Sequence, residues 1–473
     1  MRGVEVGSIP LDRLASLVDK ERAERLMDYA VRARTLLADR IVWNVNATAT
    51  GGGVAEMLQA LLAYGRGAGV DTRWLVLDAT PDFFRITKRV HNLLHGSPGD
   101  GGPLGAAERA AYEAALAPNL EHLLAVVRPQ DIVLLHDPQT AGLVPALRAA
   151  GLHPVWRSHV GRDTPNALTE AAWEFLRPYV EPSEAMIFSR PVYAPAWTDP
   201  GRLWSIPPSL DPFTAKNRDL APADVEATLS YAGLIAPDGH PDVAFTRRDG
   251  STGMLRRHHD LILTGGSLPA DAPVVLQVSR WDRLKDMPGV LEGFVARLAD
   301  LPPDVHLMLV GPDVSGVTDD PEGQEVLEEC LTAWRAQPDV VRARVHLCSL
   351  PMDDIDENAH LVNALQQHAA VVVQKSLVEG FGLTVTEPMW KARPVVASRV
   401  GGIQDQIVHG QSGLLLDDPT DLDEFGERIL EVLRDHGLAH RLGTAARERV
   451  REQYLGDRHL AQYVDLFERV LTP

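Results

Sequence analysis

The fold is decided by one stretch, Val371-Val-Val-Gln-Lys-Ser-Leu-Val-Glu-Gly-Phe-Gly-Leu-Thr-Val-Thr-Glu-Pro-Met-Trp390. Its beginning, Ala369 to Val373, is a continuous apolar run rich in β-branched residues, which is typical of a strand buried on both faces. A polar turn follows, then Gly380 and Gly382, and then a helical segment from about Thr384. A strand, a glycine loop and a helix N-terminus together predict an anion-binding site, because the first backbone N–H groups are exposed and the helix dipole favours negative charge.

Two carboxylates lie on either side of this loop. Glu379 precedes the glycines, and Glu387 follows eight positions later. Glu387 is then about one turn into the predicted helix, close to the predicted anion-binding site. An anion site between two hydrogen-bond acceptors suits a ligand with phosphate between two sets of hydroxyls. A nucleotide-sugar has this layout, with a sugar, a diphosphate and a ribose.

Length and composition bound the class of protein. The chain has 473 residues, enough for two or three domains, and its 45% hydrophobic and 23% charged residues are ordinary for a soluble globular protein. Its net charge of −19 argues against nucleic acid or an anionic membrane as the main partner. Cys330 and Cys348 have no neighbouring Cys or His cluster, so we expect reduced thiols.

No apolar run approaches the ~18–20 residues of a membrane span, and the N-terminus lacks the apolar core of a signal peptide. We therefore expect a cytoplasmic protein.

Strands and helices alternate along most of the chain, which predicts an α/β protein with parallel, doubly wound sheets. We expect a helical arm over residues 1–39, a first Rossmann-like domain over 40–207 and a second over 208–450, with the proline-dense stretch 207–212 as the boundary. Residues 451–473 are expected to form a helix that packs back on the first domain. The arm is expected on the first domain too, with a homodimer contact as the alternative.

Residues 237–257 are polar and glycine-bearing, and we interpret them as an insertion loop. The simplest architecture is two Rossmann-like domains facing a cleft, with ligands bound at the carboxyl ends of both sheets.

A second glycine loop, Gly51-Gly52-Gly53, lies between the first predicted strand and a helix. It invites comparison with the dinucleotide fingerprint, but Glu56 stands where that pattern needs its third glycine, and Asp78 is a weak match to the ribose-binding acid. A nicotinamide oxidoreductase is therefore disfavoured. A tight turn without ligand remains an alternative, and glycines here would also let the backbone approach a ligand closely.

Charged and imidazole side chains follow several predicted strands. Arg280 and Lys285 come just after one strand of the second domain, where an Arg can grip diphosphate oxygens and a Lys adds a point charge. A solvated surface pair is the alternative. His136 and His159 both end strands of the first domain, which makes them better catalytic candidates than the other histidines. The Asp354-Ile-Asp356 sequence precedes a helix, so capping is favoured over a metal site.

These residues resemble a known family. The 372–387 segment is similar to the Glu-x7-Glu motif of family-4 retaining glycosyltransferases, which have the GT-B fold, and 278–286 resembles their diphosphate-binding Arg/Lys element. Within that family the chain most resembles the trehalose glycosyltransferring synthases. The supporting segments are Asn44–Glu56, Asp82–Asn92, His136–Gln139, Trp156–His159 and Pro207–Pro212.

The resemblance implies a nucleotide-diphosphate glucose donor, ADP- or UDP-glucose, with glucose as acceptor and trehalose as product. No cofactor or metal is implied beyond this co-substrate. By the family pattern, Glu379 would hold donor-sugar hydroxyls, Glu387 the ribose, and Arg280 with Lys285 the leaving diphosphate, while His159 would face the reacting carbon. The remaining implied donor contacts are Gly52, Gly53, Gly380, Phe381, Gly382, Leu383 and Thr384, and the implied acceptor contacts are Asp82, Lys88, Asn92, His136 and Asp137.

Two alternatives stay open. A trehalose phosphorylase of the same fold would use inorganic phosphate in place of the nucleotide. A catalytically silent sugar-nucleotide-binding protein would retain the donor site without turnover, although the intact set Glu379, Glu387, Arg280 and Lys285 argues against it.

Overall fold

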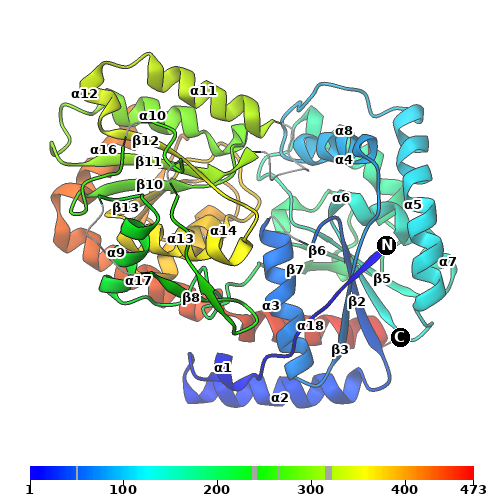
Figure 1. The fold of residues 1–473 in the computed structure, drawn as a ribbon. Helices are drawn as coiled ribbons and strands as arrows, with labels where there is room; N and C mark the ends of the chain where they lie inside the picture. The colour runs from blue at the N-terminus through cyan, green and yellow to red at the C-terminus, as the bar shows by residue number, and fades with distance from the viewer. Residues whose placement is uncertain (50–51, 237–241, 259, 265, 315–321, 473) are drawn as a thin grey trace. The chain divides into compact units, whose positions relative to one another are not determined.

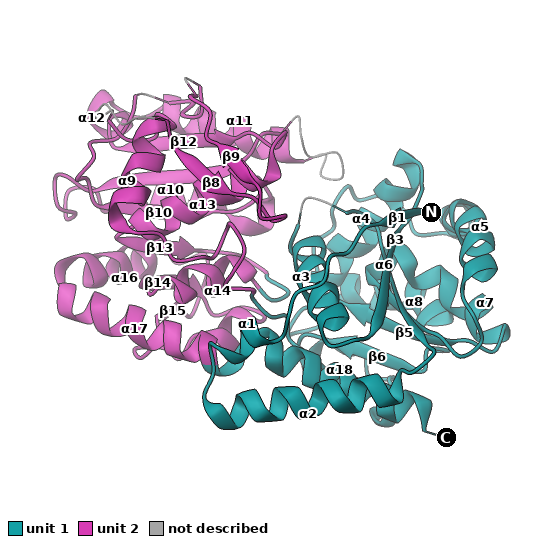
Figure 2. Ribbon diagram, turned by 60° about the horizontal axis from the view of Figure 1, so that its bottom comes forward, with its two compact units in different colours: residues 1–210, 379–381, 452–473 teal, residues 211–378, 382–451 magenta. Residues whose placement is uncertain are grey.

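The computed structural model describes residues 1–49, 52–236, 242–258, 260–264, 266–314 and 322–472. Figure 1 shows two bodies of alternating strands and helices. The first compact unit comprises residues 1–210, 379–381 and 452–473, and the second comprises 211–378 and 382–451 (Figure 2). Each unit is built around its own sheet, which is parallel throughout in unit 2 and parallel except for one edge strand in unit 1.

Unit 1 has a seven-stranded sheet in the order β1-β3-β2-β4-β5-β6-β7. Every strand runs parallel to its neighbours except β1, which pairs antiparallel with β3. The strands are β1 (Arg2–Val4), β2 (Ile41–Asn46), β3 (Asp71–Val76), β4 (Ile132–His136), β5 (His153–Ser158), β6 (Ala185–Phe188) and β7 (Leu203–Ser205).

The central strands of unit 1 are buried on both faces, as their apolar sequences predict. Val45, Leu135 and Trp156 belong to the core on one face, and alternate residues such as Val42 and Leu134 belong to the core on the other. The longer helices that cover these faces are α2 (Lys20–Leu36), α3 (Gly53–Gly67), α4 (Pro81–Leu94), α5 (Ala106–Val126), α8 (Ala167–Val180) and α18 (Gly456–Leu471). Short helices complete the unit: α1 (Asp12–Ala15), α6 (Asp137–Thr140) and α7 (Val144–Ala149).

The N-terminal arm is only partly helical. The expectation of a purely helical arm is wrong at its start, because Arg2–Val4 forms β1 at the sheet edge. Helix α2 packs along α18, and the Arg22 guanidinium binds the Asp457 carboxylate at 2.7 Å. The two ends of the chain are therefore joined within unit 1.

Unit 2 has a six-stranded sheet in the order β12-β11-β10-β13-β14-β15, with all pairs parallel. The strands are β10 (Val274–Val278), β11 (His306–Pro312), β12 (Val345–Leu350), β13 (Val371–Gln374), β14 (Val395–Ser398) and β15 (Leu414–Leu416). Its helices are α9 (Pro222–Tyr231), α10 (Met287–Ala296), α11 (Gly323–Arg335), α12 (Asp339–Arg342), α13 (Ile355–His368), α14 (Leu383–Trp390), α15 (Ile403–Gln406), α16 (Leu422–Arg434) and α17 (His436–Gln453).

The 237–257 segment is not simply a loop. Of its described part, Ala244–Thr246 (β8) and Thr252–Met254 (β9) form an antiparallel hairpin, while 237–241 lie outside the described residues. Arg247 binds Asp354 at 2.6 Å and Arg248 binds Asp356 at 2.9 Å, so ion pairs fasten the hairpin to the start of α13. The interpretation of this segment as a loop is wrong over 244–254, where the two strands pair. The sequence did not reveal this, because the partners of these arginines lie about a hundred positions away.

Strand order fixes where a ligand can bind in each unit. In unit 1 the chain passes from β2 to β3 on one side and later adds β4 on the other side of β2. In unit 2 the corresponding reversal lies between β10 and β13. Ligands of open α/β sheets bind outside the carboxyl ends of the strands at such switch points.

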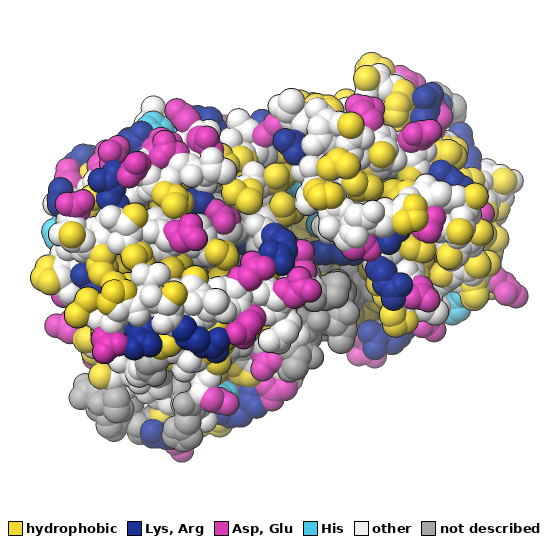
Figure 3. Space-filling view, turned by 90° about the horizontal axis from the view of Figure 1, so that it is seen from above, with side chains coloured by type: hydrophobic (Ala, Val, Ile, Leu, Met, Phe, Trp, Pro, Cys, Tyr) yellow, Lys and Arg dark blue, Asp and Glu magenta, His cyan; other side chains and the backbone are white. Residues whose placement is uncertain are grey.

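Charged side chains of both signs are mixed over the face that Figure 3 shows. Among the described residues, no helix is both long and apolar enough to span a bilayer. Cys330 and Cys348 are buried and free.

Candidate functional site

The Arg280–Lys285 segment follows β10, at the switch point of unit 2. The Asp282 carboxylate shapes this segment: Oδ2 accepts a hydrogen bond from the Arg280 guanidinium at 3.1 Å, and Oδ1 accepts from the Leu284 backbone N–H at 2.8 Å. The Arg280 side chain remains 38% exposed, whereas that of Asp282 is buried. A buried carboxylate thus holds the guanidinium at the edge of the sheet.

Beneath this segment lie polar residues that the sequence analysis did not identify. The Gln277 Nε2 atom donates to the Lys285 carbonyl at 2.8 Å, and its Oε1 accepts from the Lys375 backbone N–H at 3.4 Å. The fully buried Lys375 ammonium forms an ion pair with Asp286. These contacts connect the loops that follow β10 and β13.

Helix α14 begins at the glycine loop, one residue earlier than predicted. Gly382 precedes it at φ 89° and ψ 66°, a left-handed conformation that favours glycine. The Gly382 carbonyl accepts from the backbone N–H groups of Val385 and Thr386 at 2.9 and 3.4 Å. The hydroxyl of Thr384 in the same turn is buried, and it has no hydrogen-bond partner among the described residues. This helix start fits a ligand that accepts hydrogen bonds.

Glu387 lies in a network of cations and amides. Its Oε1 pairs with Lys216 Nζ at 2.9 Å, and its Oε2 accepts from Gln366 Nε2 at 3.2 Å. One turn later Lys391 Nζ donates to Gln366 Oε1 at 2.8 Å and to Asn217 Oδ1 at 3.2 Å. Burial lowers the pKa of Lys391 to about 7, although the nearby Glu387 charge opposes the shift. Lys391 is four positions from Glu387, a helical spacing that was visible in the sequence.

Glu379, Gly380 and Phe381 pack in unit 1. The Tyr193 hydroxyl donates to the Gly380 carbonyl at 2.8 Å and to the Glu379 carbonyl at 3.2 Å. A Cβ atom at Gly380 would lie 2.4 Å from the carbonyl oxygen of His159. Only glycine permits this approach, which brings Glu379 and the backbone of His159 into one neighbourhood.

His136 and His159 form a stacked pair in unit 1. His136 is the last residue of β4 and His159 directly follows β5, with the ring centroids 5.4 Å apart. His136 Nδ1 lies 3.2 Å from His159 Nε2, and His136 Nε2 lies 3.0 Å from Asn44 Oδ1. Burial, with a smaller effect from the Arg157 cation, lowers the pKa of His136 to about 3 and places that of His159 well below its usual range. Both rings are therefore neutral near pH 7.

Asp137, a predicted acceptor contact, supports the backbone of His159. Its Oδ1 accepts from the His159 backbone N–H at 2.7 Å, and its own backbone has a left-handed φ of 65°. Burial raises the pKa of this carboxyl to about 7, while the hydrogen bond from His159 and the Arg157 cation act against the shift.

Arg157 is a fully buried cation that the sequence analysis missed. Its guanidinium donates to the Ile206 carbonyl at 2.9 Å, contacts His459 Nε2 at 3.2 Å and donates to the Tyr463 hydroxyl. Helix α18 thus contributes to the neighbourhood of the histidine pair.

The other predicted residues of unit 1 lie at the start of α3 and along α4. Gly52 precedes α3 at φ 130° and Gly53 is its first residue, whereas Gly51 lies outside the described residues. Asp82 is exposed and pairs with Arg85 at 2.9 Å, Lys88 is half-buried, and Asn92 is buried near the end of α4. No contact between these three side chains and the histidine pair is seen in the described part of unit 1. Their roles stay predictions.

The capping interpretation of Asp354 is confirmed. Its Oδ1 accepts from the backbone N–H groups of Asp356 and Glu357 at 3.1 Å each, at the N-terminus of α13.

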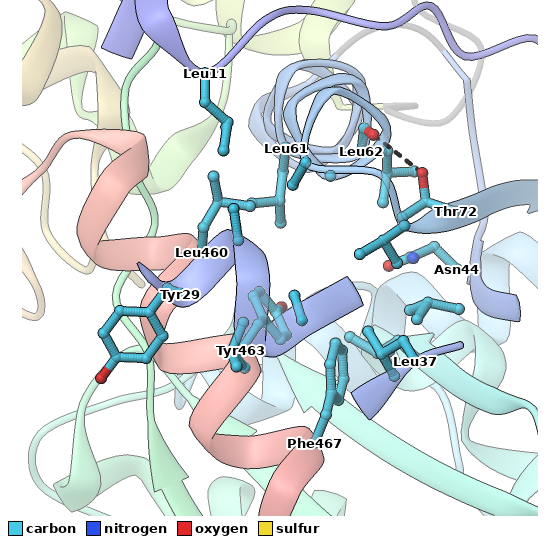
Figure 4. A pocket seen from close by; sticks show the side chains of 18 of the residues that line it. Leu11, Tyr29, Leu37, Asn44, Leu61, Leu62, Thr72, Leu460, Tyr463 and Phe467 are labelled. Carbon is cyan, nitrogen blue, oxygen red and sulfur yellow. Dashed lines mark hydrogen bonds between the residues drawn. The ribbon is translucent and has the colours of Figure 1, made fainter. Parts of the chain in front are cut away.

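An apolar cavity of about 70 Å³ in unit 1 is a poor candidate for a sugar or phosphate site (Figure 4). Leu61 of α3 and Leu460, Tyr463 and Phe467 of α18 line it. The hydroxyl of Thr72 at its wall donates to the Leu62 carbonyl at 3.0 Å, as the dashed line shows. The lining therefore offers almost nothing to hydroxyls or negative charge.

Comparison with known proteins defines the class. Family models match residues 44–195, described as trehalose synthase, N-terminal domain, and residues 265–449, described as glycosyl transferases group 1. The solved structure of a UDP-forming α,α-trehalose-phosphate synthase from Burkholderia xenovorans shares the fold, with a TM-score of 0.66 at 15% identity over 92% of this chain and 100% of that one. The protein is a glycosyltransferase with the GT-B fold.

Two relatives narrow this class. The trehalose synthase of Pyrococcus horikoshii is 32% identical over 461 residues, which cover 97% of this chain and 96% of that protein. The chain therefore belongs to the trehalose synthase family, and it is a hexosyltransferase acting on trehalose-related sugars. A trehalose phosphorylase of Pleurotus sajor-caju is 28% identical over 86% of this chain, which spans only 54% of that longer protein.

Proposed function

We propose that the protein transfers glucose from a nucleotide-diphosphate glucose, ADP- or UDP-glucose, to free glucose and forms α,α-trehalose with retention at the anomeric carbon. One structural observation carries the donor assignment. The loop with Arg280 and Lys285 follows β10, and the loop that leads into α14 follows β13, the two strands at the switch point of unit 2. Cations and a helix N-terminus at one switch point are what a diphosphate requires.

In this proposal unit 2 binds the nucleotide. Arg280 and Lys285 neutralise the diphosphate, and the first N–H groups of α14, at Leu383 and Thr384, bind phosphate oxygens. Glu387 accepts hydrogen bonds from the ribose hydroxyls, because two contacts from Lys216 and Gln366 leave its carboxylate with unused lone pairs. The co-substrate is the nucleotide-sugar, and no further cofactor is invoked.

The residues of unit 1 contact the sugars. Glu379 holds donor-sugar hydroxyls and His159 lies at the reacting carbon, a pairing supported by the packing of Gly380 on the His159 backbone. His136, Asp137 and the α4 residues Asp82, Lys88 and Asn92 are proposed on the acceptor side.

The chemistry needs no protein nucleophile in this scheme. The acceptor hydroxyl oxygen bonds to the anomeric carbon as the bond from that carbon to the phosphate oxygen breaks. The acceptor proton passes to the leaving phosphate oxygen on the same face of the sugar. The contribution of the chain is positioning the two sugars and stabilising charge on the leaving diphosphate.

The test is a donor and acceptor screen read by mass spectrometry, with the anomeric configuration of the product read by NMR. ADP- or UDP-glucose with glucose is expected to give α,α-trehalose and the free nucleoside diphosphate. Absence of a disaccharide with every nucleotide donor, in protein that is folded by circular dichroism, would reject the proposal.

Phosphorolysis is the second candidate, favoured by the similarity to the Pleurotus phosphorylase. Trehalose would be incubated with phosphate in one reaction and with ADP or UDP in another. Formation of a sugar phosphate with phosphate, and of no nucleotide-sugar with ADP or UDP, identifies a phosphorylase. Formation of a nucleotide-sugar with ADP or UDP identifies the transferase.

A further inference from the structure

Three side chains from adjacent strands form a hydrogen-bonded row in unit 1. Asn44 comes from β2, His136 from the end of β4 and His159 from the residue after β5, and these strands are neighbours in the sheet. The row has two contacts, 3.0 Å from Asn44 Oδ1 to His136 Nε2 and 3.2 Å from His136 Nδ1 to His159 Nε2. Asn44 and His136 are both buried.

The direction of these hydrogen bonds follows from the acceptor at the inner end. An amide oxygen only accepts, so the hydrogen of the His136 ring must be on Nε2. Because a neutral imidazole carries one N–H, His136 Nδ1 is then the acceptor, and His159 Nε2 must be the donor. The remaining nitrogen of His159, Nδ1, carries a lone pair, and the ring's hydrogen bond within the described residues is made through Nε2.

We propose that Asn44 is a positioning residue for the transfer reaction, which fixes the tautomer of His159 through His136 so that His159 presents Nδ1 as a hydrogen-bond acceptor. The consequence for substrate binding, which rests on the proposed function, is that this nitrogen receives a hydrogen bond from a sugar hydroxyl and cannot donate one.

The surroundings keep both rings neutral, which is the condition for a defined tautomer. Burial and the Arg157 cation disfavour protonation of His136 and His159, and His459 adds to the effect on His159. The one carboxylate bound to this pair in the described structure, Asp137, accepts from the backbone N–H of His159. The amide of Asn44, and not a carboxylate, therefore determines the tautomer of the His159 ring, through His136.

The other side of Asn44 is apolar, so its amide has little choice of partner. Asn44 lies at the wall of the apolar cavity, and the close-up shows its side chain among the hydrophobic lining (Figure 4). Another polar lining residue, Thr72, donates its hydroxyl hydrogen to the Leu62 carbonyl. His136 is the hydrogen-bond partner of the Asn44 side chain in the described part of unit 1.

The direct test is long-range ¹H–¹⁵N NMR on the full chain with ¹⁵N-labelled histidine, which distinguishes protonated from lone-pair ring nitrogens. His159→Gln and His136→Gln variants assign the two sets of signals. In the wild type, His159 is expected to show N–H at Nε2 and a lone pair at Nδ1. The opposite tautomer would mean that Asn44 turns its NH₂ group toward His136, and would overturn the inference.

Two substitutions of Asn44 separate the tautomer effect from loss of packing. Asn44→Leu removes the acceptor, so both tautomers of His159 are expected, with kcat/KM reduced about 10- to 100-fold, as for other partners that orient a functional histidine. Asn44→Asp restores an acceptor at His136 Nε2, so the wild-type tautomer and activity are expected to return at alkaline pH, where the His136 ring is neutral beside a carboxylate.

Asn119→Leu is the matched control. Asn119 is another buried asparagine of unit 1, but its amide bonds only to backbone groups of Asp78 and Ala115 among the described residues. This variant is expected to lose stability without changing the His159 signals. If Asn44→Leu left the tautomer unchanged, the inference would fail. If the tautomers behaved as expected but no nucleotide-sugar gave product, the proposed function would fail and the positioning role of Asn44 would stand.

Discussion

Lys375 and Asp286 form a partly buried ion pair between the segments that follow β13 and β10, the two strands at the switch point of unit 2. The lysine follows β13, and the aspartate, in a left-handed conformation at φ 50°, caps α10 by accepting from the Gly289 backbone N–H at 3.2 Å. The side chain of Lys375 is 1% exposed and that of Asp286 19%. The pair therefore joins the segment that carries Arg280 and Lys285 to the segment that follows β13.

Removing the lysine is expected to be costly. Lys375→Met leaves the Asp286 charge without its partner and should lower the free energy of unfolding by about 3 kcal/mol. Urea unfolding would measure this loss, and a KM for the donor that rises in the same variant would report loosening of the Arg280 segment. The Lys375→Met, Asp286→Asn double variant should lose less than the sum of the single losses. Additive losses would contradict the coupling.

Arg280 is predicted to act on the leaving group. Arg280→Ala should lower kcat/KM. The expected loss of transition-state stabilisation is roughly 3 kcal/mol, the scale of one preorganised charge donor. Steady-state kinetics with the nucleotide-sugar would measure it.

Arg283→Ala is the matched control for Arg280, since Arg283 lies on the same segment but binds the exposed carboxylates of Glu325 and Glu329. Its kcat/KM should stay close to wild type. Equal effects of the two substitutions would remove the special role of Arg280.

Gly380 is predicted to tolerate no side chain. In Gly380→Ala the new Cβ would meet the His159 carbonyl oxygen, which belongs to the backbone and cannot swing away. The displaced loop should cost on the order of 100-fold in kcat/KM, as expected when reacting groups shift by about 1 Å. Gly7→Ala, where a Cβ meets nothing within 4 Å, is the control. Unchanged kinetics in Gly380→Ala would show that the observed approach is not needed for activity.

The fold is predicted to be sensitive to mild acid. Burial lowers the pKa of seven described histidines, His136, His159, His306, His346, His360, His368 and His459. The unfolded chain protonates these rings as pH falls below about 6.5 while the folded chain resists, so stability should decrease, by up to about 1.4 kcal/mol per pH unit for each ring.

Asp137 acts in the opposite direction, because its pKa is raised to about 7 in the folded chain. The folded chain takes up this proton as pH falls below 7, which adds stability in acid, and that stability is lost as pH rises through 7. Urea unfolding at pH 7.5, 6.5 and 5.5 would measure the balance, and His346→Gln should flatten the slope. A free energy of unfolding that stays constant down to pH 5.5 would be contrary to this expectation.

Much of the fold could be predicted because its signals are local. The buried run at Val371–Val373 and the glycine at Gly382 each determine the conformation of their own segment, and they are found as β13 and the start of α14. The parallel sheets likewise follow from continuous apolar runs that alternate with helical segments. The short edge strand β1 was missed because three residues carry no periodicity, and pairing with β3 creates it.

The polar support of the candidate site could not be predicted, because it depends on which strands become neighbours. Lys375 has the sequence context of a turn residue, and its partner Asp286 is 89 positions away. Asn44 and His136 are separated by 92 positions and meet only because β2 and β4 pair. Arg157 depends on α18, whose docking is a tertiary event. His136 and His159 were identified because strand-end position is a property of the sequence itself.

The division of the chain into units 1–210, 379–381 and 452–473 against 211–378 and 382–451 has a practical consequence for protein engineering. A truncated chain that ends at residue 210 would lack both α18 and the Glu379–Phe381 tripeptide, so it would expose the apolar faces that these segments cover. Chimeras between relatives should therefore exchange residues 211–378 and 382–451 together. Residues 379–381 should keep the sequence of the protein that supplies unit 1. Shuffling libraries with a single crossover near residue 210 would join segments that never evolved against each other.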